Sequence, residues 1–130
     1  MVITRYSQLV MPQDANVVGT LFGGQMVSWM DIAASKSVHR FLKDTEAELA
    51  LTRAIDAIEF KEPVYVGNWV NFEAKVTKAG SSSIIIQINA YKESHKIDKI
   101  LACTAIFTFV SVKKNKDGTF DKIRHNKLVK

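Results

Sequence analysis

The sequence is poor in the residues that cross-link, break or anchor a chain. It contains two prolines and a single cysteine, Cys103, so no internal disulfide can form, and this usage suits a reducing compartment. No apolar run reaches the roughly 20 residues that a membrane span needs, and the opening MVITRYSQLV lacks the apolar core of a signal peptide. We therefore expect a cytoplasmic protein without a membrane partner.

Several catalytic and nucleotide-binding signatures are also missing. There is no G-x-S-x-G, no Walker motif and no G-x-G-x-x-G. The sequence therefore gives no support for a serine hydrolase, a nucleotide hydrolase or a dinucleotide-dependent oxidoreductase. His39, His95 and His125 follow no metal-binding spacing, so we predict no metal and expect these three side chains to be solvated.

Size and charge are those of one globular domain. The 130 residues are 47% hydrophobic and 24% charged, enough to build a real core over residues 1–130. The net charge of +5 favours anionic partners, and much of the surplus lies in a basic, mobile tail at residues 113–130. No nucleic-acid recognition motif accompanies this tail, so we expect no nucleic acid and consider a phosphate-bearing small molecule at least as good a match.

The central stretch is Asn16 to Arg40, which reads NVVGTLFGGQMVSWMDIAASKSVHR. It opens as a loop, passes the pair Gly23-Gly24, and then runs apolar for about five helical turns. Apolar residues occupy almost every side of that helix, which is typical of a buried helix. We predict a buried helix over residues 24–41, roughly 27 Å long.

The rest of the chain alternates strand patterns with short turns. Strands are predicted over residues 3–10, 49–60, 70–77, 84–91 and 100–112. The order of one strand, a long helix and four hairpin-linked strands predicts an α+β fold in which an antiparallel sheet wraps the helix. One sheet cannot cover a helix that is apolar on all sides, so we expect a dimer to bury the remaining face.

Asp31 is the one carboxylate inside the apolar helix, and two interpretations compete. It is either a buried structural residue hydrogen-bonded to the backbone or to Ser35, or a catalytic base or nucleophile held in a cleft. Gly23 and Gly24 lie at the helix start, where free N–H groups would form an oxyanion hole. Their alternative role is close helix-on-sheet packing. Because about 10 Å separates Asp31 from these glycines, a neighbouring protomer is expected to supply one of the two groups.

Other polar residues allow weaker predictions. Asn16 either orients water or a carbonyl group or is a plain turn residue, and Asp14 is interpreted as a turn or cap residue. Cys103 lies in an apolar strand and is predicted to be inert core. One further segment has hydroxyls, backbone N–H groups and a cation that would bind a phosphate group. A plain hairpin turn is the alternative interpretation of this segment. That segment comprises Lys78, Gly80, Ser81, Ser82 and Ser83.

Four segments together resemble the hot-dog-fold acyl-CoA thioesterases, in particular the short single-domain bacterial branch. They are MPQDANVVGTLFGGQMVSWMD, AIDAIEFKEPVYVGNWV, KAGSSSIIIQI and ACTAIFTFVSV. The resemblance covers roughly Leu9 to Val112, and its most specific part is N-x-x-G-x-x-F-G-G with a downstream M-D. It implies a long central helix wrapped by a five-stranded antiparallel sheet. It also implies dimers with their sheets side by side, trimers of such dimers, and an active site at the dimer interface.

The resemblance also assigns site residues. Asp31 matches the catalytic acid, Asn16 an asparagine beside the thioester, and Gly23 and Gly24 the amides that polarise its carbonyl. The family's Gly-Arg-Ser-Ser segment becomes Ala79-Gly80-Ser81-Ser82-Ser83 here, so the arginine is missing or its role has passed to Lys78.

The function implied is hydrolysis of acyl-CoA to a free acid and CoA. Asp31 would activate water, or would attack directly to form an anhydride. CoA belongs to the substrate and product, and no separate cofactor is expected. Lys78 and the Lys113–Lys116 cluster would meet the CoA phosphates. The alternatives are a non-catalytic acyl-CoA-binding module and a thioesterase acting on acyl carrier protein. A hydratase would keep the fold but usually needs a histidine in the site.

Overall fold

The computed structural model describes residues 2–47 and 49–129. Strand β1 (Thr4–Leu9) and a 3₁₀ turn (Pro12–Asp14) precede the long helix α1 (Gly23–Phe41). The remaining elements are β2 (Leu49–Phe60), β3 (Trp69–Ala79), β4 (Ser83–Glu93), β5 (Ile100–Lys114) and β6 (Phe120–Lys122). No helix in these two ranges is both long and apolar enough to cross a membrane.

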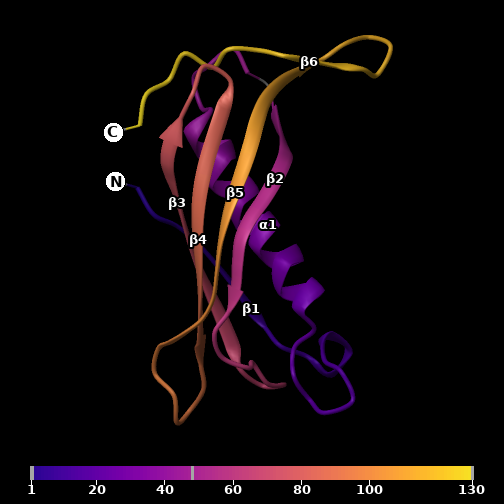
Figure 1. Cartoon of the computed structure of the whole chain (residues 1–130), viewed down its shortest axis with the longest axis vertical. Helices are drawn as coiled ribbons and strands as arrows, with labels where there is room; N and C mark the ends of the chain where they lie inside the picture. The colour runs from indigo at the N-terminus through magenta and orange to yellow at the C-terminus, as the bar shows by residue number, and fades with distance from the viewer. Residues whose placement is uncertain (1, 48, 130) are drawn as a thin grey trace.

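All strands belong to one antiparallel sheet with the order β1-β3-β4-β5-β2, and β6 pairs with the end of β5 (Figure 1). The chain leaves β1, passes through α1 and enters the sheet again at the far edge as β2. The predicted α+β fold is confirmed. The sheet has six strands instead of five, because β6 adds a short strand that the sequence did not reveal.

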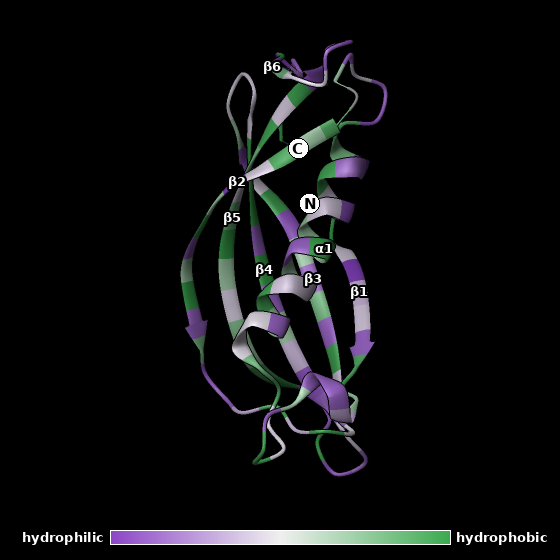
Figure 2. Ribbon diagram, turned by 90° about the vertical axis from the view of Figure 1, so that its right-hand side faces the viewer, coloured by the Kyte–Doolittle hydropathy of each residue, from purple (hydrophilic) through white to green (hydrophobic). Residues whose placement is uncertain are grey.

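Helix α1 lies along one face of the sheet (Figure 2). Met30, Ala33 and Ala34 have no exposed surface, and the Trp29 ring meets Phe72 of β3 edge-on with centroids 6.4 Å apart. The opposite side of the helix is open, since Ile32 is 47% exposed. As expected, the sheet covers one side of the helix only, and burial of the other side by a second protomer stays a prediction.

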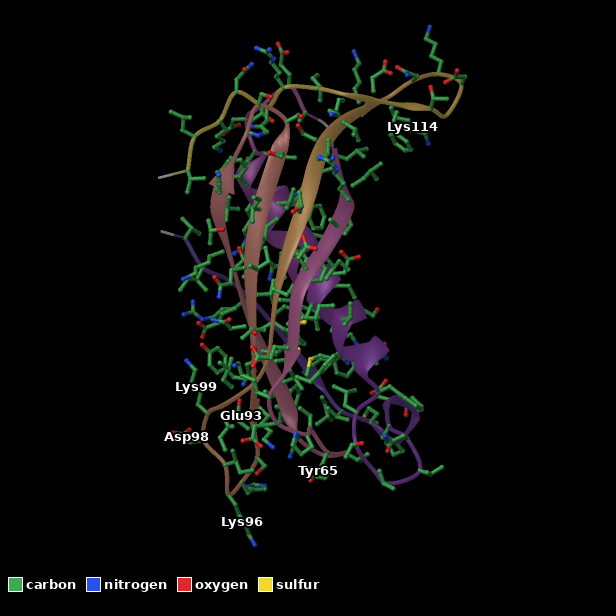
Figure 3. The ribbon with its side chains drawn as sticks, viewed as in Figure 1. Tyr65, Glu93, Lys96, Asp98, Lys99 and Lys114 are labelled. Carbon is green, nitrogen blue, oxygen red and sulfur yellow. The ribbon has the colours of Figure 1, made fainter. Side chains whose placement is uncertain are left out.

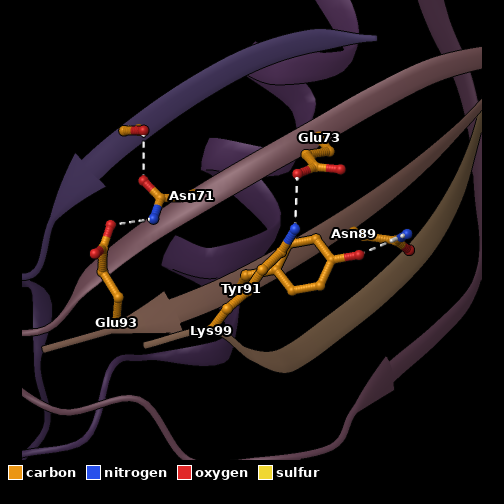
Figure 4. A network of polar contacts seen from close by, with 7 residues as sticks. Asn71, Glu73, Asn89, Tyr91, Glu93 and Lys99 are labelled. Carbon is orange, nitrogen blue, oxygen red and sulfur yellow. Dashed lines mark hydrogen bonds and ion pairs between the residues drawn. The ribbon is translucent and has the colours of Figure 1, made fainter. Parts of the chain in front are cut away.

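Strands β3 and β4 both bury alternate residues, and in β3 this follows the alternation of apolar and polar residues in the sequence. Their outward residues form a polar network over the other face of the sheet (Figure 4). Asn71 accepts a hydrogen bond from Ser7 of β1 and donates to Glu93 of β4. Lys99 forms an ion pair with Glu73 at 3.3 Å. These contacts link three neighbouring strands on the side of the sheet that faces away from α1.

Strand β2 does not present the single apolar face that its sequence suggests, with Leu49, Leu51, Ile55 and Ala57 together. Its pairing with β5 shifts register after Thr52 and again after Asp56, and Ala57 has a positive φ of 51°. Each shift turns the following residues toward the other face. As a result Ile55 packs on the core, whereas Leu51 is 42% exposed.

The residues after β6 return to the core. His125 is 3% exposed, so the expectation of a solvated side chain is wrong for this histidine. Its Nδ1 accepts from the Lys127 N–H at 3.0 Å, which leaves Nε2 to donate to the Ser83 carbonyl at 3.2 Å. Its ring also meets Phe41 of α1 edge-on, and its backbone N–H donates to the Ser81 carbonyl. The C-terminal segment is thus fastened to the helix end and to the β3–β4 turn.

Cys103 lies in β5 with no exposed surface and its Sγ 3.9 Å from the Met30 Sδ, as predicted for inert core. Burial raises the pKa of this thiol from 9.0 to about 11, so the reactive thiolate is scarce at neutral pH. We expect Ellman's reagent to leave native protein unlabelled at pH 7.5 and to titrate one thiol per chain in denaturant. Labelling of the native protein at the rate of free cysteine would contradict this burial.

Candidate active site

The loop before α1 is held by Asp14, which is 8% exposed. Its two carboxylate oxygens accept hydrogen bonds of 2.9 Å from the Met11 N–H and from the Gln25 side chain. Its backbone carbonyl accepts from the Phe22 N–H at 3.0 Å. The predicted turn or cap role is confirmed, since this residue fixes the first turn of the helix to the loop that leads into it.

Asn16 organises the same loop with both ends of its side-chain amide. Its Oδ1 accepts from the Val18 and Thr20 N–H groups at 3.1 Å, and its Nδ2 donates to the Thr20 hydroxyl at 2.7 Å. The interpretation as a turn residue is therefore confirmed. One Nδ2 hydrogen remains for another acceptor, so a role beside the substrate stays a prediction.

The two glycines at the helix start differ. A Cβ on Gly23 would lie 3.3 Å from the Phe60 ring of β2, so close packing explains this glycine. A Cβ on Gly24 would meet nothing within 4 Å, which leaves the backbone there open to approach. The N-cap residue Phe22 makes no side-chain capping bond, and the first N–H groups of a helix lack intrahelical partners. The start of α1 is thus suited to receive an oxyanion.

Beside this helix start lies a cleft of about 320 Å³ that Gly23, Met26, Phe60 and Pro63 help to line. Phe60 is 55% exposed. Asp31 is not among the lining residues, and the seven residues after Gly24 place it about 10 Å further along the axis. The separation expected from the sequence holds in the structure, because one chain does not bring both groups into one cleft.

Asp31 lies at the border between the covered and open sides of α1, and it is half-buried. Its Oδ1 accepts a hydrogen bond of 2.7 Å from the Thr52 hydroxyl of β2. Ser35 donates to the Asp31 backbone carbonyl and not to the carboxylate. Within the described part of the chain, Oδ2 has no hydrogen-bond partner. The partners expected for a structural aspartate, the backbone and Ser35, thus do not bond the carboxylate, which is positioned and accessible; its catalytic role stays a prediction.

Thr52 is the functional candidate that the sequence did not indicate. It lies 21 residues from Asp31, in a strand whose register toward the helix no local pattern reveals. An exposed threonine in a strand is ordinary, since β-branched residues favour strands. Only its contact with the carboxylate distinguishes it.

The predicted phosphate segment lies at the opposite end of the molecule from the helix start. Figure 3 places Lys114, at the end of β5, far from Tyr65, which forms a β-bridge with Thr20 of the helix-start loop. Gly80 to Ser83 make the β3–β4 turn, and the Gly80 N–H donates to the Ser83 carbonyl at 3.0 Å. The hairpin-turn interpretation is confirmed, and phosphate binding by this turn and by exposed Lys78 stays a prediction.

Comparison with known proteins agrees with this architecture. The thioesterase superfamily profile matches residues 18–98. The chain belongs to this family. It is 30% identical to an uncharacterised acyl-CoA thioester hydrolase of Zymomonas mobilis, over 80% of this chain and 68% of that protein. It is 33% identical to one of Bacillus subtilis, over 82% of this chain and 60% of that protein. The resemblance to hot-dog acyl-CoA thioesterases is thereby confirmed.

Solved structures place the fold in the same group. A hexameric thioesterase from Yersinia pestis superposes with a TM-score of 0.79 at 30% identity, covering 94% of each chain. An acyl-CoA hydrolase from Bacillus cereus superposes with a TM-score of 0.83 at 27% identity, over 98% of this chain and 73% of that chain. Across residues 2–47 and 49–129, no group of three or more acidic, cysteine or histidine side chains is arranged to hold a metal ion.

The role of Asn16 in the loop can be tested without a substrate. Replacing Asn16 with Ala removes the acceptor shared by the Val18 and Thr20 amides, so their hydrogen exchange should become roughly fivefold faster or more. Asn16→Asp keeps an acceptor oxygen and should retain most of the protection. Equal exchange in the wild type and Asn16→Ala would show that the backbone holds the loop unaided.

Proposed function

We propose that this protein is an acyl-CoA thioesterase, which hydrolyses the thioester of acyl-CoA to a free acid and CoA. The observation that carries the proposal is the Asp31 carboxylate. Thr52 holds one of its oxygens, and no described residue bonds the other. The family assignment and the names of the relatives, acyl-CoA thioester hydrolases, support this substrate class.

The proposed reaction needs one base and one oxyanion site. Asp31 Oδ2 removes a proton from water as the water oxygen attacks the thioester carbonyl carbon. The Gly24 N–H at the helix start stabilises the negative charge that develops on the carbonyl oxygen. The C–S bond then breaks, and the departing CoA sulfur takes up the proton that Asp31 holds. Thr52 keeps the carboxylate oriented, and no group beyond the substrate's own CoA is required.

A second copy of the chain would bring these two groups together. Strand β2 is an edge of the sheet, and next to α1 it leaves Leu51, Ile58 and Phe60 between 38% and 55% exposed. Exposed edges with apolar side chains are normally covered. We propose that two sheets join along β2, so that Asp31 of one protomer faces the helix start of the other. Trimers of such dimers would give a hexamer, which is the reported assembly of the Yersinia pestis neighbour.

The CoA phosphates are proposed to bind at the β3–β4 end, where Lys78 and the Lys113–Lys116 cluster gather positive charge. This end is remote from the helix start of the same chain. An extended CoA molecule would thus have its thioester near Asp31 and its nucleotide near the turn at Gly80. The family's arginine is absent here, so lysines would provide the charge as point contacts and not as a bidentate fork.

The decisive experiment is thiol release from acetyl- through palmitoyl-CoA by the wild type and by Asp31→Asn. Loss of a general base typically costs about 10²- to 10⁴-fold, so we expect kcat to fall by at least ~10²-fold. Thr52→Val should reduce kcat less, because it removes only the orienting hydrogen bond. Ser35→Ala is the matched control on the same helix face, since the Ser35 hydroxyl donates to the Asp31 backbone carbonyl and not to its carboxylate, and it should keep wild-type turnover.

Two results would overturn this assignment. Full turnover by folded Asp31→Asn would remove the proposed base. Tight acyl-CoA binding without thiol release by the wild type would make the protein a binding module. Hydrolysis confined to acyl-carrier-protein thioesters would change the substrate class and leave the role of Asp31 intact.

The proposed dimer predicts a dependence of activity on the β2 edge. Ile58→Lys places a charge on an apolar residue that is 38% exposed, which should split the assembly while the monomer stays folded. Light scattering should show a smaller particle, and thiol release should fall with it. Ile3→Lys changes an equally exposed residue, 37%, directly before β1 at the opposite edge of the sheet, and should keep both. An active Ile58→Lys monomer would refute the shared site.

A further inference from the structure

A second cavity, of about 220 Å³, lies at the C-terminal half of α1. Thr4 of β1, Val76 of β3 and Ser37 of α1 line it, together with the C-terminal segment at Lys127 to Val129. Figure 1 shows both chain ends arriving at this side of the molecule. The mechanism proposed above uses none of these residues.

Two hydroxyl groups line this cavity, one from β1 and one from α1. Thr4 is 2% exposed and Ser37 is 4% exposed, and neither side chain makes a hydrogen bond to any residue that the structure describes. Two hydroxyls from two different elements therefore line one cavity, where each can donate a hydrogen bond to a polar ligand.

The charge around the cavity is positive. Arg40 and Lys127 both line it, and no acidic side chain does. Arg40 forms no ion pair with any carboxylate in the described ranges. Lys127 donates to the Lys43 carbonyl at 3.2 Å, which uses one of its three donors. The helix C-terminus contributes about −0.5 charge, and two full positive charges exceed it. The site therefore favours an anion.

The remaining walls are apolar, with Phe41, Val76 and Val129 among them. A volume of about 220 Å³ is below the roughly 300–1,000 Å³ of sites for drug-sized molecules. We propose that this cavity binds a small carboxylate with a short apolar chain. The carboxylate accepts hydrogen bonds from Arg40 and from the Thr4 and Ser37 hydroxyls, and the chain packs against Phe41 and Val76.

This carboxylate site is separate from Asp31. Arg40 follows Asp31 by nine residues, which at 3.6 residues per turn places it half a turn around the helix. Asp31 faces β2 through Thr52, whereas the cavity opens beside β1, and these strands are opposite edges of the sheet. The ligand class is that of the acid released by the proposed reaction, and this link alone rests on the proposed function.

The test is calorimetric titration of hexanoate into the full-length Asp31→Asn protein, so that binding is measured without hydrolysis. Acetate carries the same charge without the chain, and hexanol carries the chain without the charge. Both should bind at least about tenfold more weakly than hexanoate, because each lacks one half of the recognition. Hexanoate should bind with unchanged affinity in the presence of saturating CoA.

Variants then locate the site. Arg40→Gln should weaken hexanoate binding about tenfold or more, the loss expected for a charge-assisted hydrogen bond, and Thr4→Val should weaken it several-fold. Arg5→Gln removes the same charge from the exposed neighbour of Thr4 on β1 and should bind as the parent does. Equal binding by Arg40→Gln and its parent, or displacement of hexanoate by CoA, would overturn the proposal. Binding would still be measurable if thioesterase activity were absent, so the two proposals fail separately.

Discussion

The structure depends on the fact that one sheet can cover only one side of a helix. Ala33 and Ala34 have no exposed surface, and their small side chains let α1 approach the sheet closely. The other side of the helix keeps Ile32 largely exposed. Asp31 falls on the border between these two sides. A fully buried carboxylate would be strongly destabilising without partners, and a fully exposed one would have no fixed orientation. At the border, one hydrogen bond from Thr52 is sufficient to position it.

Strand and helix positions were largely predictable because their signals are periodic. The bounds of β2 match the prediction, and the predicted helix differs from α1 by one residue at its start. What the periodicity did not predict was which side of an element is covered. In β2 two register shifts turn the side chains after Thr52 and Asp56, and such shifts leave no clear mark in the order of residues. Which side of an element is covered depends on the elements that pair with it, and the local sequence does not contain that information.

The C-terminal segment was missed for a different reason. Its polar residues have no alternation and no apolar run, so nothing in the pattern indicates order. His125 is nevertheless buried, because its backbone and ring find acceptors in the carbonyls of Ser81 and Ser83 and because Phe41 covers the ring. These partners lie about 40 residues away or further. A separation of 21 residues likewise explains why Thr52, unlike the lone acid Asp31, did not stand out in the sequence.

Each of the two edge strands places a threonine beside the helix. Strand β2 supplies Thr52 to Asp31 on one side of α1, and strand β1 supplies Thr4 to the cavity beside Arg40 on the other side. No further strand covers the outer side of an edge strand. Polar groups in the space between an edge strand and the helix therefore remain accessible. A second copy joined along β2 would cover the first of these spaces and leave the second open. The active site proposed here would then require assembly, whereas the carboxylate site would be complete in each chain.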